Sequence, residues 1–219
     1  MVRDDRPSAL RVGLILIPPP TRGTLARMKA EELSAIWGKE IVRFPRRAAA
    51  AAPIGNATRD FLTEVGLPHS AAPFLSFGRV YSADSDSEVY LPSMRVAFGL
   101  DDPEFDRFIL IGSDGSDDPL AIDRETDEVV WLVEEEEGGV VRFVNVDVES
   151  LARCLVVYRE FVGKVTQGDE MAFLENRFDE ASIDWLEAAL RQADARALSE
   201  GAMWAIEIQS LRAAAAEAD

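Results

Sequence analysis

The stretch that decides the fold is FDRFILIGSDGSDDPLAIDRETDEVVWL, residues 105–132. It holds three short apolar runs of β-prone residues, which predict strands at 108–111, 120–123 and 129–133. Only a few polar and glycine residues separate each run from the next, whereas parallel neighbours would need a crossover of about a dozen residues or more. The three runs therefore predict an antiparallel meander, whose first turn begins at Gly112-Ser113-Asp114-Gly115.

Strand and helix signals flank this meander on both sides. Strands that are grouped between helices, rather than alternating with them, indicate an α+β fold in which a curved antiparallel sheet carries helices at its N-terminal and C-terminal sides. Composition changes nowhere abruptly, so we expect a single domain over residues 25–219, preceded by an N-terminal extension over residues 1–24. The further predicted strands are 41–44, 74–80, 88–91, 95–98 and 140–144. The predicted helices are 25–37, 56–65 and one that starts after Asn145 or Asp147. Residues 163–169 are expected to form a loop and the remainder to be helical, with Ser199 as the cap of the last helix.

The extension contains one apolar run, Val12–Ile17, which is too short to span a bilayer and is followed by three prolines. It could add an edge strand to the sheet. Asp4 and Asp5 do not fit the basic start of a signal peptide, so we expect no membrane association. The single cysteine, Cys154, excludes an internal disulfide and is compatible with a reducing cytoplasm.

Residues 147–162 show the three-four spacing of a buried helical stripe, which includes Leu151, Cys154 and Tyr158. Cys154 is therefore expected to be a core residue rather than a nucleophile, because no histidine or local base motif accompanies it. The single histidine, His69, lies between Pro68 and Ser70 and is expected at the surface or in a cap.

The net charge of −17 is concentrated in the middle of the chain. Residues 81–150 carry 20 Asp and Glu against 4 Lys and Arg, a net charge of −16. Repulsion of this density destabilises a compact state, and a positively charged partner surface would relieve it. The plain alternative is a solvated acidic face that only aids solubility. Nucleic acid is not expected as a direct partner, because backbone binding requires a basic footprint.

Candidate chemistries in the acidic segment are weak. Asp114, Ser116 and Asp118 follow the spacing of a calcium loop, but Pro119 stands where that loop requires glycine. A looser divalent site among the aspartates stays open, although clustered turn aspartates are usually solvated. Gly112–Gly115 lacks the following Lys-Ser/Thr of a phosphate loop, and the many carboxylates single out no acid–base pair. We expect no metal and no cofactor.

Several short patterns resemble the SUKH superfamily of bacterial immunity proteins. They are Trp37-Gly38, Phe44-Pro45, the Phe61-Leu62 to Leu67-Pro68 segment, Phe108-Ile109-x-Ile111-Gly112-x-Asp114-Gly115, Leu120–Thr126, Phe143-Val144-Asn145, and a helical tail with Asp194, Ala197, Leu198 and Trp204. The resemblance covers about residues 30–210 and rests on packing and turn patterns without catalytic content. The extension over residues 1–24 and the four-glutamate run depart from the family pattern.

The resemblance implies a non-enzymatic α+β protein that binds a cognate polymorphic toxin, often one that acts on nucleic acid, in the cytoplasm of the producing cell. Because such toxins tend to present basic surfaces, we expect acidic residues to make the contact, with Tyr81 or Tyr90 as aromatic anchors. The predicted contact residues are Asp84, Asp86, Glu88, Asp114, Asp117, Asp118, Glu134, Glu135, Glu136 and Glu137. The alternatives are a regulatory or scaffold domain with a non-toxin partner and, last, an enzyme that uses clustered aspartates with a divalent ion.

Overall fold

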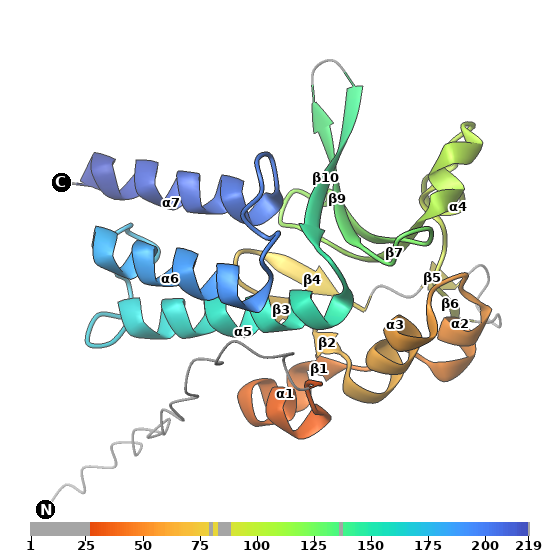
Figure 1. Cartoon of the computed structure of the whole chain (residues 1–219), viewed down its shortest axis with the longest axis horizontal. Helices are drawn as coiled ribbons and strands as arrows, with labels where there is room; N and C mark the ends of the chain where they lie inside the picture. Colours follow the sequence, from red (N-terminus) through yellow and green to blue (C-terminus); the bar gives the residue numbers. More distant parts are fainter. Residues whose placement is uncertain (1–26, 79–80, 83–88, 136–137, 219) are drawn as a thin grey trace, which may run out of the picture.

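The structure is a computed structural model, and it describes residues 27–78, 81–82, 89–135 and 138–218. Its centre is a six-stranded antiparallel sheet with the order β10-β9-β8-β7-β4-β3 (Figure 1). The four strands from β7 to β10 are neighbours in space as they are in the chain, which confirms the predicted meander. The strands are β3 (Ser70–Ala71), β4 (Leu75–Phe77), β7 (Phe108–Ser113), β8 (Pro119–Asp123), β9 (Val129–Glu135) and β10 (Gly138–Asn145).

Both faces of this sheet are buried at β7. Successive residues of a strand point to opposite faces. Ile109 and Ile111 therefore join the main core, whereas Phe108 and Leu110 join a second, smaller cluster around Met94. Burial on both faces explains why this strand reads as a nearly continuous apolar run rather than as an alternating one.

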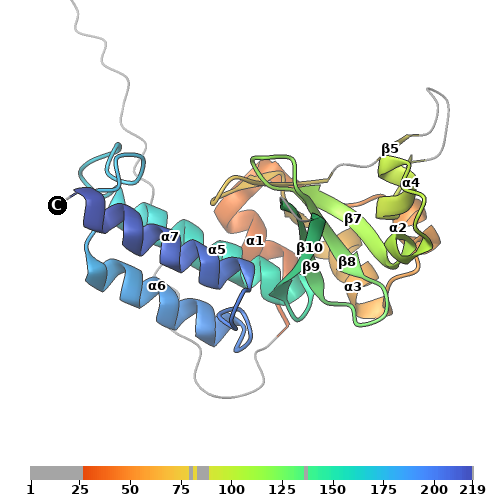
Figure 2. The ribbon, with the colours of Figure 1, turned by 90° about the horizontal axis from the view of Figure 1, so that it is seen from above.

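The C-terminal helices form a layer beside the sheet (Figures 1 and 2). They are α5 (Val148–Val165), α6 (Glu180–Ala193) and α7 (Met203–Ala218). Asp147 caps α5 by accepting the N–H of Ser150 at 2.7 Å, so the second of the two predicted caps is the one used. The buried stripe of α5 is confirmed as well, with Cys154 fully buried on it.

Three details of this half differ from the sequence-based expectations. α5 continues through Gly163 to Val165, where we expected a loop from Gly163 onward. Residues 171–178, expected to be helical, form turns, and Phe173 and Phe178 stack there with ring centroids 6.2 Å apart. Ser199 does not cap the last helix, because its hydroxyl donates to the carbonyl of Arg196 at 2.8 Å and α7 begins only at Met203.

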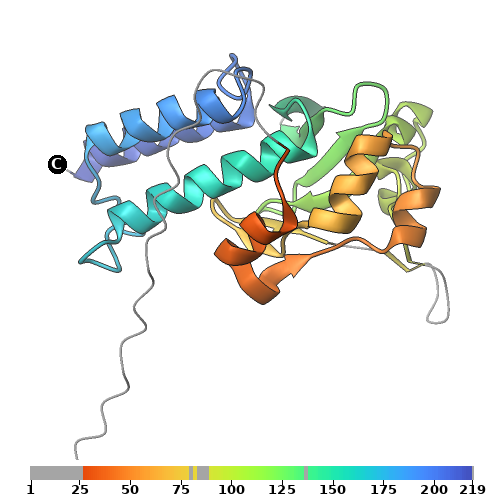
Figure 3. The same cartoon turned by 60° about the horizontal axis from the view of Figure 1, so that its bottom comes forward.

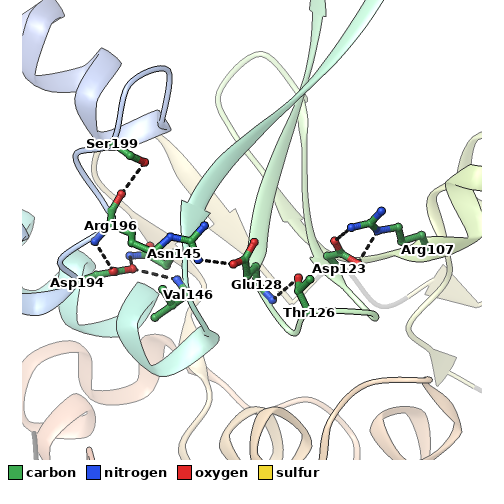
Figure 4. Close-up of polar contacts among 9 residues, drawn as sticks. All are labelled: Arg107, Asp123, Thr126, Glu128, Asn145, Val146, Asp194, Arg196 and Ser199. Atoms are coloured by element: carbon green, nitrogen blue, oxygen red, sulfur yellow. Dashed lines mark hydrogen bonds and ion pairs between the residues drawn. The ribbon is translucent and has the colours of Figure 1, made fainter. Parts of the chain in front are cut away.

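A buried polar network fixes this helical layer to the sheet (Figure 4). Asn145, at the end of β10, donates to Asp194 at 2.9 Å and accepts from the indole N–H of Trp204 at 3.0 Å. The same Asp194 oxygen also accepts a hydrogen bond from the backbone N–H of Val146 at 2.9 Å. Asn145, Asp194 and Trp204 are all members of the family-like pattern, and their shared role is to position the C-terminal helices.

The N-terminal helices lie on the side of α5 that faces away from α6 and α7 (Figure 3). The first helix begins at Ala30 and not at Leu25 as expected, because residues 27–29 are held in an irregular stretch. Met28 is buried there, and its backbone N–H donates to the Glu149 carboxylate of α5 at 2.6 Å. The elements are α1 (Ala30–Trp37), η1 (Gly38–Glu40), α2 (Arg46–Ala51), α3 (Asn56–Asp60) and its π-helical continuation η2 (Phe61–Val65).

Two short ladders complete the N-terminal half: β1 (Ile41–Val42) with β2 (Leu67–Pro68), and β5 (Tyr81–Ser82) with β6 (Val89–Tyr90). The backbone there is tightly packed. Gly66, at φ 86°, would place an added Cβ 2.4 Å from the carbonyl oxygen of Val42, so this position requires glycine. Val12–Ile17, the expected edge strand, lies outside the described residues.

The second face of the sheet is covered by a helix where we expected a strand. Residues 95–98 belong to α4 (Met94–Phe98), which is followed by the 3₁₀ helix η3 (Pro103–Arg107). Ser93 caps α4 by accepting the N–H of Val96, and Gly99 ends it in the left-handed conformation at φ 65°. These two cap signals outweigh the β-like alternation of so short a segment.

Candidate partner-binding surface

The structure describes only some of the predicted contact residues. Asp114, Asp117 and Asp118 lie in the β7–β8 turn (residues 114–118), and their side chains are described. Glu134 and Glu135 end β9, and Tyr81 and Tyr90 belong to the β5–β6 ladder, but these four side chains are outside the described part. The residues that fall wholly outside the described ranges are Asp84, Asp86, Glu88, Glu136 and Glu137.

Asp114 has a structural role in the β7–β8 turn. Its carboxylate accepts the backbone N–H groups of Ser116 and Asp118 at 2.8 and 2.9 Å, and its own N–H donates to the carbonyl of Asp118 at 3.0 Å. This is the familiar use of aspartate to close a turn. It leaves Asp117, an exposed residue with φ 67°, at the tip of the turn.

The sheet register brings this turn to the same end as the β9–β10 hairpin. Leu120 pairs with Trp131, so β9 runs beyond the start of β8 towards Glu135. Phe74, in the β3–β4 turn, also lies there, since a Cβ added to Gly115 would be 3.0 Å from the Cβ of Phe74. Phe74 is 72% exposed and has φ 60°, an uncommon backbone conformation for a bulky residue. We call this end of the sheet the hairpin end.

The strands that flank residues 83–88 lie elsewhere. β6 contacts α2, and the β5–β6 ladder is well separated from the described ends of β9 and β10 (Figure 1). The β7–β8 turn and the end of β9 therefore lie toward the same end of the sheet, whereas the flanks of residues 83–88 are near the N-terminal helices.

The acidic residues of the β8–β9 turn (residues 124–128) and its preceding Asp123 are used inside the molecule. Asp123 is almost fully buried and forms an ion pair with Arg107, whose Nε donates to Oδ1 of Asp123 at 2.7 Å (Figure 4). Burial alone would raise the pKa of Asp123, but the hydrogen bonds from Arg107 and from the backbone of Glu125 outweigh it and hold that pKa below its ordinary value.

The remaining carboxylates of this turn have partners from distant parts of the chain. Asp127 accepts the N–H of Gly55 at 2.9 Å, which joins the turn to the start of α3. Glu128 pairs with Arg196, whose guanidinium lies 4.3 Å from the ring centroid of Phe143. This turn connects the two helical parts of the protein and leaves little free charge.

The segment from α4 to η3 (residues 94–107, the α4–η3 segment) has the opposite character. Val96 and Phe98 are 56% and 50% exposed. Asp101, Asp102 and Glu104 follow them, are exposed, and form no ion pair within the described part of the chain. Sequence reasoning missed this surface because it assigned residues 95–98 to a strand of the sheet. The signals that could have found it were Ser93 and Gly99 at the helix ends.

The residues that the sequence offers for chemistry have structural surroundings in this fold. Burial raises the pKa of the Cys154 thiol, which Asn145 contacts at 3.3 Å, so this thiol is poorly suited to act as a nucleophile. No group of three or more His, Cys, Asp or Glu in the described ranges is placed to hold a metal ion. A hollow beside α7 is lined by Arg177 and Arg212, and both guanidinium groups are paired with carboxylates. Among the helices that are described, none is long and apolar enough to cross a membrane.

Comparison with known proteins supports the family-like pattern. A family model described as SUKH-4 immunity protein matches residues 28–209, a range that includes the sheet, the α4–η3 segment and most of the C-terminal layer. No curated protein and no solved structure matches the chain. The match spans most of the 219 residues, and the chain therefore belongs to the SUKH-4 immunity protein family.

Proposed function

We propose that this protein neutralises a cognate toxin in the cytoplasm of the cell that produces both, by binding to it and without a chemical step. Family membership supports a toxin-neutralising role in general. The negative charge of this protein supports a toxin that presents a basic surface, as a toxin that acts on nucleic acid would. A surface of this sign steers association with a positively charged partner and shields that partner from its own substrate.

The observation that carries this proposal is the position of the β7–β8 turn, with Asp117 and Asp118, at the end of the sheet toward which the backbone of β9 runs. The exposed Phe74 lies beside this turn at Gly115. We propose that Asp117, Asp118 and Glu134–Glu137 contact the toxin there, and that Asp114 supports them by holding the turn. Asp84, Asp86 and Glu88 are proposed as a separate, peripheral part of the same electrostatic surface.

The test uses the protein encoded by the reading frame directly upstream of this chain, which the proposed function expects to carry the cognate toxin domain. The variant Asp117→Lys/Glu134→Lys/Glu135→Lys reverses three charges at the hairpin end. Its association rate at low salt should fall by about tenfold or more, and the rate should depend less on ionic strength. The matched control, Glu170→Lys/Glu200→Lys/Glu217→Lys, changes the net charge equally on exposed residues of the C-terminal half.

The control should retain the association rate of the unmodified protein within about twofold, because local charge and not net charge governs steering at these distances. Equal effects in the two variants would remove the hairpin end from the mechanism. A toxin domain that the unmodified protein neither binds nor inhibits would overturn the proposed function and favour a regulatory or scaffold role.

A further inference from the structure

The α4–η3 segment exposes apolar side chains that the fold does not need at the surface. α4 is anchored by Met94, which is buried in the smaller cluster with Phe108 and Leu110. Val96 and Phe98 on the same short helix point away from that cluster and are half exposed or more. Two exposed apolar groups on one short helix, beside a buried anchor, are the kind of surface that marks an interaction site.

Hydrogen bonds hold the two helices of the segment to each other and to the sheet. Asp106 joins its two helices, since it accepts from the Ser93 hydroxyl and from the Arg95 guanidinium, each at 2.8 Å. Asp102 caps η3 by accepting the N–H of Glu104 at 2.9 Å. The N–H of Leu110 in β7 donates to the carbonyl of Pro92, just before α4, at 2.9 Å. A surface that is held in this way loses little conformational entropy when a partner binds.

Charge determines which partner this surface fits. Arg95 and Arg107 are paired with Asp106 and Asp123, and Arg124 lies close enough to Asp106 to help lower its pKa. The apolar residues are bordered by the exposed carboxylates of Asp101, Asp102 and Glu104, which form no ion pair within the described residues. This border disfavours nucleic acid and anionic lipid. It also disfavours a second copy of this chain, because a two-fold contact would bring the same carboxylates together.

We propose that the α4–η3 segment is the anchoring site for the cognate toxin, and that it receives a toxin surface in which Lys and Arg surround an apolar pocket. This inference rests on the proposed function and adds the contact that holds the complex together. Phe98 and Val96 fill the pocket, and Asp101, Asp102 and Glu104 pair with the basic rim. The hairpin end steers the encounter, and the α4–η3 segment sets the lifetime of the complex.

The experiment measures association and dissociation rates with the upstream-encoded toxin domain. Val96→Ala/Phe98→Ala removes the apolar anchors from solvent-exposed helical positions, where alanine favours the helix. The matched control, Met171→Ala/Leu174→Ala, removes similar side chains that are 47% and 63% exposed in the turns between α5 and α6. We expect at least a tenfold rise in Kd for the first variant, mainly through faster dissociation, and a change within twofold for the control.

A charge variant separates the rim from the anchors. Asp101→Asn/Asp102→Asn/Glu104→Gln keeps the side-chain shapes and the cap of η3, and it should raise Kd at least fivefold with a weaker salt dependence. Circular dichroism and thermal melting confirm the fold of each variant. Toxin binding within twofold of the unmodified protein by Val96→Ala/Phe98→Ala would overturn this inference and leave the proposed function standing.

Two other outcomes would also overturn it. Failure of the unmodified protein to bind the toxin domain removes the proposed function, and this inference falls with it. A dimer of the unmodified protein in sedimentation, lost in Val96→Ala/Phe98→Ala without any change in toxin affinity, would assign the surface to self-association instead.

Discussion

The β8–β9 turn and the α4–η3 segment both carry several carboxylates and are joined through Arg107, the last residue of η3, yet their side chains serve different ends. In the turn, Asp127 and Glu128 have partners from distant parts of the chain, and the adjacent, buried Asp123 pairs with the half-buried Arg107. In the α4–η3 segment, Asp101, Asp102 and Glu104 face solvent beside exposed apolar groups. An acidic residue therefore indicates a binding surface only where the fold leaves it without an internal cation.

The largest effect expected from this comparison is on stability, at Arg107. Arg107→Met would leave the buried Asp123 without its cation, and we expect the largest loss in the free energy of unfolding among these variants, because a buried charge without its partner is strongly destabilising. The Arg107 side chain is itself 34% exposed, so water offsets part of that loss. Urea denaturation measures it. Arg95→Met, which breaks the more exposed pair with Asp106, should cost clearly less.

Acid should weaken the same contact. The pKa of Asp123 is lowered in the folded protein, so its ion pair contributes stability above the unfolded pKa and loses that contribution as the pH falls through the folded value. The unfolding free energy of the unmodified protein should therefore fall below about pH 4, and that of Asp123→Asn should fall less over the same range. Parallel curves for the two proteins would contradict this role.

The second effect sets Asp127 against Asp101. Asp127→Ala removes the acceptor of the Gly55 N–H and places alanine at φ 61°, where a Cβ is strained. We expect a loss of about 2 kcal/mol, from the unsatisfied N–H and the backbone together. Asp101→Ala should change the unfolding free energy by less than about 0.5 kcal/mol, since it is exposed and outside any internal contact in the described structure. Similar losses in both variants would erase the distinction between the two segments.

A third effect comes from a carboxylate that pairs with no cation in the described part of the chain. Glu207 of α7 accepts the hydroxyl of Tyr158, and burial raises the pKa of Glu207 above its ordinary value. A raised pKa means stability that is complete below the unfolded pKa and declines as the pH rises through the folded value. Glu207→Gln should therefore stabilise the protein at pH 7, by less than Asp127→Ala destabilises it, and should match the unmodified protein near pH 4. Thermal melting over this pH range measures the difference.

These contrasts show which parts of the structure sequence reasoning could reach. The meander and the buried stripe of α5 were predicted correctly, because hydrophobic periodicity and a local cap such as Asp147 are properties of short segments. The helix α4 was missed because five residues are too few for periodicity to decide between strand and helix. The extent of the domain, residues 25–219, stays a prediction.

The candidate site was harder to predict because it depends on long-range pairing. The acidic middle of the chain was evident, but Glu128 finds Arg196 from 68 positions away, and Asp127 finds Gly55 from 72 positions away. No local sequence pattern indicates which carboxylates form such long-range ion pairs and hydrogen bonds. The sequence could therefore predict a negatively charged protein but could not separate the β8–β9 turn from the α4–η3 segment.

The smallest effect on stability is expected where the effect on binding is large. Asp101→Asn/Asp102→Asn/Glu104→Gln should change the unfolding free energy by no more than about a few tenths of a kcal/mol, because the relief of repulsion among neighbouring carboxylates offsets the lost attraction between Glu104 and Arg107. A surface kept for binding is often not the most stable one available to the fold. Urea denaturation of this triple variant beside Asp123→Asn tests the expectation. A clear loss of stability in the triple variant would mean that Asp101, Asp102 and Glu104 are structural residues, and that the two acidic segments do not differ in kind.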